Sequence, residues 1–206
     1  MTLTHAAQPD AAPMTDITTT RGRSETGAPT TYNQRAAAPT RWSADSDRTS
    51  VDFAVKTFWG LFTVRGHFDR FSGSYEVGPD GARVELTIDA DSLDTGNAKR
   101  DEHLRSTDFF AVAEHPQVRF ASTRVRESGD GTLRVEGDLH AAGKVVALEL
   151  DATVARLHDG QLEIEAATTV DQRSLGMGSG LPGMIRPPAT LHVKALLSDA
   201  AAKERS

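Results

Sequence analysis

The sequence predicts an all-β protein whose antiparallel strands close into a barrel or stack as a sandwich. Apolar and polar residues alternate along eight separate stretches of the 206-residue chain, which is typical of strands that bury one face. Short links rich in glycine, proline and aspartate join several of these stretches, as they do between antiparallel neighbours. Parallel pairing would need a crossover of about a dozen residues each time. Long strands with hairpin links favour the barrel over the sandwich.

The first forty or so residues differ in composition from the rest of the chain. Residues 1–40 are rich in threonine, alanine and proline and nearly free of large apolar side chains. Such a segment cannot bury enough apolar surface to offset the entropy lost on ordering. We expect a disordered tail at 1–40, a barrel domain at 41–198 and a frayed tail at 199–206. The start of the chain shows no secretory signal pattern, which favours a cytoplasmic location.

Composition argues against several classes of function. The formal net charge is −6 without long basic runs, which argues against binding of nucleic acid. The chain has no cysteine, so thiolate metal sites and disulfides are excluded, and its histidines lack the spacing of a metal site. No apolar run is long enough to span a membrane. We expect no metal, no cofactor and no membrane-spanning segment.

The expected strands follow from the alternation of side chains. In the first, Val51 and Phe53 face one way and Asp52 the other. Gly66 and Gly137 fall on inner faces, where glycine marks a bend or leaves room for another group to approach. Turn signals stand at 59–60, 79–81, 129–131, 142–144 and 158–160. The expected strands are 51–56, 62–69, 83–89, 117–120, 133–140, 146–154, 162–171 and 191–195.

Two segments interrupt this alternation. Residues 91–110 lie between the third and fourth strands and predict a short helical insertion that ends in Phe109 and Phe110. Residues 177–188 contain three prolines, which predict a loop before the last strand and a possible gate to the interior.

These stretches, in this order and spacing, resemble the YceI-like polyisoprenoid-binding family. The likeness runs from Trp42 to about Leu197. It rests on SVDFAVK at 50–56, FTVRGHF at 62–68, DTGN at 94–97, RDEHLRS at 100–106, DFF at 108–110, VEGDL at 135–139 and DQRSLGM at 171–177. The resemblance implies an eight-stranded, lipocalin-like antiparallel barrel with an apolar tunnel for an isoprenoid or similar long-chain lipid. Thr57 stands where many relatives have a histidine. Whether the protein pairs as a homodimer stays open.

A barrel of this size suits a lipid tail. Strands of about ten residues tilted by about 40° enclose an interior on the order of 25 Å tall. Each buried methylene contributes about 0.8 kcal/mol, so a prenyl chain needs no charged partner. The same apolar residues could instead fill a solid core. With the resemblance, we expect a lipid-binding carrier and not an enzyme.

The expected ligand contacts are mostly apolar residues of the inner face. Arg100 and His103 are three apart on the insertion, so they share a helix face and either contact a head group or stay solvated. Phe109 and Phe110 either close the cavity or anchor the core. We predict no catalytic residue and these ligand contacts: Phe53, Val55, Phe58, Trp59, Phe62, Val64, Leu86, Ile88, Arg100, His103, Leu104, Phe109, Phe110, Phe120, Val135, Leu148 and Ile164.

Two alternative functions stay open from the residues. The first is an enzyme that acts on an apolar, lipid-like substrate with His103 as the base. The second is a ligand-free structural or interaction module that recruits a partner through the residues before Arg41.

Overall fold

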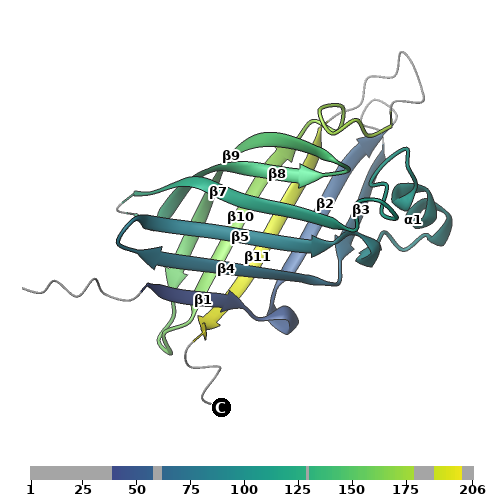
Figure 1. Cartoon of the computed structure of the whole chain (residues 1–206). Coiled ribbons are helices and arrows are strands. Elements are labelled where there is room, and N and C mark those ends of the chain that lie inside the picture. The colour runs from purple at the N-terminus through teal and green to yellow at the C-terminus, as the bar shows by residue number, and fades with distance from the viewer. Residues whose placement is uncertain (1–38, 58–61, 129, 179–187, 201–206) are drawn as a thin grey trace, which may run out of the picture. The chain divides into compact units, whose positions relative to one another are not determined.

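A computed structural model describes residues 39–57, 62–128, 130–178 and 188–200, which all belong to one compact unit. Eight strands close into an antiparallel ring, which confirms the expected barrel (Figure 1). Around the ring they are β1 (Thr40–Ala44), β4 (Phe71–Gly78), β5 (Gly81–Asp89), β7 (Gln117–Ser128), β8 (Thr132–Ala141), β9 (Lys144–Arg156), β10 (Leu162–Val170) and β11 (Ala189–Asp199). The ring closes where Trp42 of β1 pairs with Asp199 of β11.

Three further strands extend the sheet from β11. They are β2 (Ser50–Thr57), β3 (Phe62–Phe68) and the short β6 (Leu93–Asp94). Both β1 and β2 lie along the same edge of β11, separated by the single 3-10 turn Ser46–Arg48. The expected strands at 51–56 and 62–69 are therefore β2 and β3, outside the closed ring, and the other expected strands belong to it.

The sequence analysis missed β1 and β4, which complete the ring. In β1, too few residues alternate to reveal a strand, and Trp42 is its one fully buried side chain. In β4, Gly73 interrupts the apolar face between Phe71 and Tyr75. The two strands pair so that Trp42 stands opposite Tyr75, and their rings stack with centroids 5.7 Å apart. Cross-strand aromatic contact of this kind stabilises a pair that weak local patterns do not announce.

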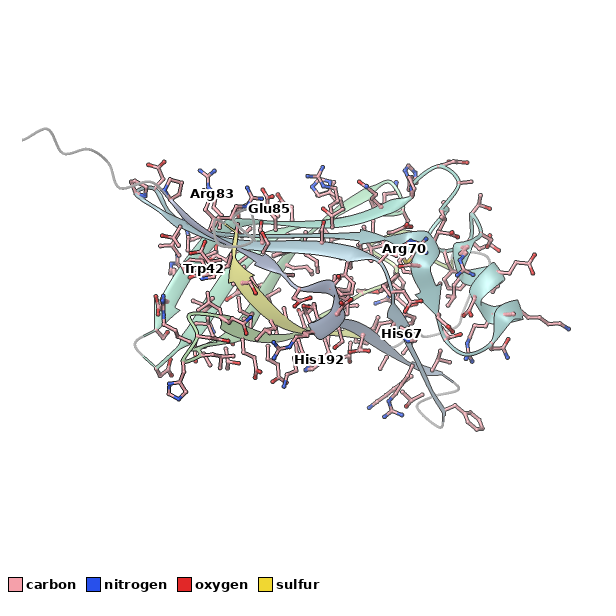
Figure 2. The ribbon with its side chains drawn as sticks, turned by 90° about the horizontal axis from the view of Figure 1, so that it is seen from below. Trp42, His67, Arg70, Arg83, Glu85 and His192 are labelled. Carbon is pink, nitrogen blue, oxygen red and sulfur yellow. The ribbon has the colours of Figure 1, made fainter. Side chains whose placement is uncertain are left out.

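The expected alternation is clearest in β8. Leu133, Val135 and Leu139 are buried, and Arg134 between them is exposed and forms a hydrogen bond of 3.2 Å with Asp151 of β9. Figure 2 shows charged side chains, including the labelled Arg83, on the outer side of the strands. The interior is therefore apolar and the outer face carries the charges.

The helical insertion lies between β5 and β7, as expected, and contains α1 (Ala98–Arg105). Several polar contacts hold it in place. The Asn97 side chain accepts a hydrogen bond of 3.1 Å from the Arg100 amide, which caps the first turn. Arg105 donates to the carbonyl oxygens of Asp91, at 2.8 Å, and Leu93, at 2.5 Å. Asp101 is the one buried residue of the helix, and its carboxylate accepts from the Thr95 amide at 3.1 Å.

The expected terminal tails lie mostly outside the described residues. Residues 1–38 of the tail predicted at 1–40 are not described, and Thr40 begins β1. Asp199 ends β11, and residues 201–206 are again outside. In the described part of the chain, no helix has the length and apolar character needed to cross a membrane.

Candidate functional site

The barrel encloses an apolar cavity of about 210 Å³. Inward-facing residues of β9, β10 and β11, such as Leu148, Ile164 and Val193, are only half-buried although they point to the interior. Their counterparts on β8, including Val135, are buried. The open space therefore lies mainly against the β9–β11 wall, and the interior is hollow and not a solid core.

Most of the predicted contacts line this cavity. The aliphatic and aromatic members come from the barrel wall and from the insertion, and all of them face the same apolar space. The predicted residues that line the cavity are Phe53, Val55, Leu86, Ile88, Leu104, Phe109, Phe110, Phe120, Val135, Leu148 and Ile164.

Four predicted contacts lie away from the cavity, and the structure corrects their placement. Phe62 is 63% exposed and Val64 is not part of the lining; both lie nearer the start of β3, whose last residue, Phe68, does line the cavity. Arg100 turns to the loop before α1 and donates to Thr95 Oγ1 at 2.7 Å and Thr95 O at 2.8 Å. His103 is exposed, with its ring against Phe109 at a centroid distance of 5.0 Å.

The predicted contacts Phe58 and Trp59 lie outside the described residues. Nothing in the structure places them relative to the cavity.

The inner-wall glycines serve the barrel's own aromatic rings. A Cβ on Gly137 would lie 2.6 Å from Phe120 Cζ and 2.5 Å from the carbonyl oxygen of Ala121. The Phe53 ring covers Gly66 in the same way. We expected glycine here to leave room for another group or to mark a bend. The first expectation is confirmed, because each glycine forms a notch that a phenylalanine ring of the barrel itself occupies.

Aromatic and aliphatic side chains close the cavity at the insertion end. Phe110 meets Phe68 edge to face at 5.9 Å, and Phe68 in turn lies 5.5 Å from Phe53. Leu175 and Met177 complete this closure and are 5% exposed each. The segment that carries them is tied to the insertion by a 2.5 Å hydrogen bond from Gly178 N to Asp108 O.

This closure was only partly foreseen. The sequence analysis assigned Met177 to a loop before the last strand, and the structure places it in a turn there, but it did not foresee that the side chain is buried in the cavity wall. Residues 179–187 of that expected loop lie outside the description. The signal that could have identified Leu175 and Met177 was the apolar pair spaced two apart within the DQRSLGM motif.

The described lining offers little for acid–base chemistry. Its ionisable members are Tyr75 and Glu85, and Glu85 is exposed. Burial, and then the charge of Glu127, raises the pKa of Tyr75 above its usual range, so its phenol stays protonated near neutral pH. Thr49 also borders the cavity, and its buried Oγ1 has no hydrogen-bond partner in the described structure.

Charged groups elsewhere are paired on the outer face. Arg173 is exposed and forms an ion pair of 2.8 Å with Asp171. Hydrogen bonds from Arg173 lower the pKa of Asp171. Among residues with a described position, no three histidine or acidic side chains are grouped to hold a metal ion.

Comparison with known sequences identifies one family. The profile of the YceI-like domain matches residues 42–196. A UPF0312 protein of Pseudomonas aeruginosa is 30% identical over 176 residues, covering 82% of this chain and 88% of the relative. A UPF0312 protein of Pectobacterium atrosepticum is 34% identical over 119 residues, and the match spans 61% of its length and 56% of this chain.

Solved structures share the barrel at low sequence identity. BcnA of Burkholderia cenocepacia superposes with a TM-score of 0.67 at 21% identity and covers 75% of this chain and 99% of its own. A polyisoprenoid binding domain from Saccharophagus degradans gives a TM-score of 0.62 at 16% identity, with 77% and 98% coverage. These similarities establish a shared fold.

Proposed function

Because the chain belongs to the YceI-like family, we propose that it is a carrier that binds an isoprenoid or similar long-chain amphiphile in its barrel. The single observation that carries this proposal is the hollow, almost wholly apolar cavity. A related fold in Saccharophagus degradans is described as polyisoprenoid binding, which supports the same ligand class. An apolar space favours a hydrocarbon chain over a polar metabolite.

The cavity size sets the length of chain that fits. A cavity of about 150 Å³ holds one benzene ring, so about 210 Å³ encloses on the order of eight carbons, or roughly two isoprene units. At about 0.8 kcal/mol for each buried methylene, this burial contributes about 6 kcal/mol, from which ordering and immobilising the ligand subtract.

Two measurements test the proposal. Organic extraction of the purified protein followed by mass spectrometry should identify a long-chain lipid. Farnesol, with three isoprene units, should bind the lipid-free protein, and Ala166→Phe should abolish binding because Ala166 lines the cavity. Ala155→Phe is the matched control on the exposed face of β9. A folded wild-type protein that yields no lipid and binds no farnesol contradicts the proposal.

We further propose that the protein binds its ligand without converting it. The lining lacks an obvious general base among the described residues, and His103 lies outside the cavity beside Phe109. His103→Ala should therefore bind farnesol as tightly as the wild type, and neither protein should convert the ligand. A wild type that converts farnesol, together with a His103→Ala variant that does not, would support the enzyme instead. The cytoplasmic location stays a prediction, which cell fractionation checks. The homodimer also stays a prediction, which light scattering checks.

A further inference from the structure

A second hollow of about 340 Å³, lined by both polar and apolar side chains, lies beside the β8–β9 hairpin. We propose that this hairpin recess, formed mainly by Glu114, His115, Gln117, His140, Gly143 and Lys144, binds the anionic oxygens of a phosphate or carboxylate head group. The inference rests on the proposed function, because the head group belongs to the lipid whose tail occupies the barrel. It places the head-group contact away from Arg100 and His103, where the sequence had left either a head-group contact or a solvated helix face open.

The walls of the recess are shaped by unusual backbone. Ala142 and Gly143 form the hairpin turn with φ of 48° and 70°. Because Gly143 has no side chain, the His115 ring packs against it, and a Cβ there would lie 2.5 Å from His115 Nε2. Ala111 also has a φ of 48°, and its carbonyl accepts from the amides of Glu114 at 2.9 Å and His115 at 2.8 Å. Non-glycine residues keep such a conformation only where their surroundings enforce it, so the recess is preformed.

The recess gathers cations that have no partner in the described structure. Many arginines of the barrel form ion pairs, such as Arg134 with Asp151 at 3.2 Å. Lys144 and Arg119 form none with described residues, and Arg119 stands opposite His140 in the β7–β8 ladder, on the same outer face. Glu114 is the one carboxylate that lines the recess. The lining itself holds one lysine and two imidazoles against one carboxylate, and Arg119 beside His140 adds a positive charge next to it, which favours an anion.

The recess and the barrel cavity share Ala141 in their linings, so they lie on either side of one residue. The Lys144 side chain also lies near the cavity closure, since its Cε is 3.9 Å from where a Cβ of Gly176 would stand. No lysine, arginine or histidine lines the barrel cavity among the described residues. An ionised head group inside the barrel would lose hydration without compensation. A charged head group is therefore expected outside, and the recess is the cationic hollow that borders the cavity.

Paired ligands with one tail separate the two sites. Calorimetry at low ionic strength compares farnesyl phosphate with farnesol, which has the same tail and no charge. The wild type should bind the phosphate about tenfold more tightly, and Lys144→Gln should remove most of this advantage while leaving farnesol within twofold. Lys99→Gln, on the exposed face of α1, should change neither affinity. Glu114→Gln should strengthen phosphate binding.

The possible results separate the two proposals. Equal affinity for farnesyl phosphate and farnesol, or an unchanged preference in Lys144→Gln, overturns the head-group site and leaves the lipid carrier standing. Binding of neither ligand overturns both. Inorganic phosphate at the concentration of the lipid should not displace farnesyl phosphate; displacement with equal potency would make the recess a site for free phosphate and overturn the assignment to a lipid.

Discussion

Substitution of Gly137 by alanine tests the notch that holds Phe120 against the barrel wall. The new Cβ would lie 2.5 Å from the carbonyl oxygen of Ala121 and 2.6 Å from Phe120 Cζ. The carbonyl belongs to the neighbouring strand β7, so it cannot withdraw without disturbing the β7–β8 ladder. Overpacking of this kind costs about 2–3 kcal/mol, which lowers the melting temperature of a domain of this size by about 4–12 °C.

Gly73→Ala is the matched control for this prediction. Gly73 also lies on the inner wall, but its nearest neighbour, the Ala44 Cβ, would be 3.5 Å from the added methyl group. Loss of glycine freedom in the unfolded chain should make this variant neutral or more stable, by up to about 1 kcal/mol. Urea and thermal unfolding measure both variants.

Ligand binding gives an independent measurement of the same substitution. In Gly137→Ala, the Phe120 ring must turn toward the cavity, so farnesol should bind more weakly than to Gly73→Ala. Phe120→Leu added to Gly137→Ala should not restore full stability, because the contact with Ala121 O remains. If Gly137→Ala were as stable as Gly73→Ala, the claim that only glycine fits beside Phe120 and the Ala121 carbonyl would be wrong.

Three further perturbations probe the cavity, the insertion and the outer ion pairs. Thr49→Val removes a buried hydroxyl without a described partner and should raise the free energy of unfolding by about 1 kcal/mol; a less stable variant in a urea titration contradicts this. Arg105→Gln should speed amide exchange across α1 and leave β8 protected, because Arg105 fastens the insertion to two backbone carbonyls. Hydrogen bonds from Arg173 hold the pKa of Asp171 below its usual range. The small contribution of this pair to stability is therefore fully present above the unfolded pKa of about 3.9. It is lost as the pH falls through the lower pKa of the folded state. Carboxyl NMR should show Asp171 titrating at higher pH in Arg173→Gln, and an unchanged titration would contradict the pairing.

Side-chain alternation predicted most of the barrel's strands, because alternation is a property of the local sequence. Its period of two identified strands with long amphipathic patterns, such as β8 and β9. It missed β1, which has few residues and takes its stability from Trp42 stacking on Tyr75. That contact joins residues far apart in the sequence, and no local pattern reports it.

The site was predictable in its apolar part and not in its polar part. Inward parity correctly placed Phe53, Phe120 and Leu148 on the cavity wall. Helical spacing correctly gave Arg100 and His103 neighbouring positions on the insertion, but it could not reveal that Arg100 bonds to Thr95. Whether the interior is hollow depends on the sum of packed volumes, which alternation does not contain.

The hollow interior itself argues for a bound ligand. An empty space of about 210 Å³ costs about 5 kcal/mol at about 24 cal/mol per Å³. That cost is comparable to the whole stability of a typical domain, about 5–15 kcal/mol. The notches at Gly66 and Gly137 keep aromatic rings out of this space, although an inward turn of either ring would fill part of it. Under the proposed function, a hydrocarbon chain that fills this space would stabilise the folded state as well as being carried.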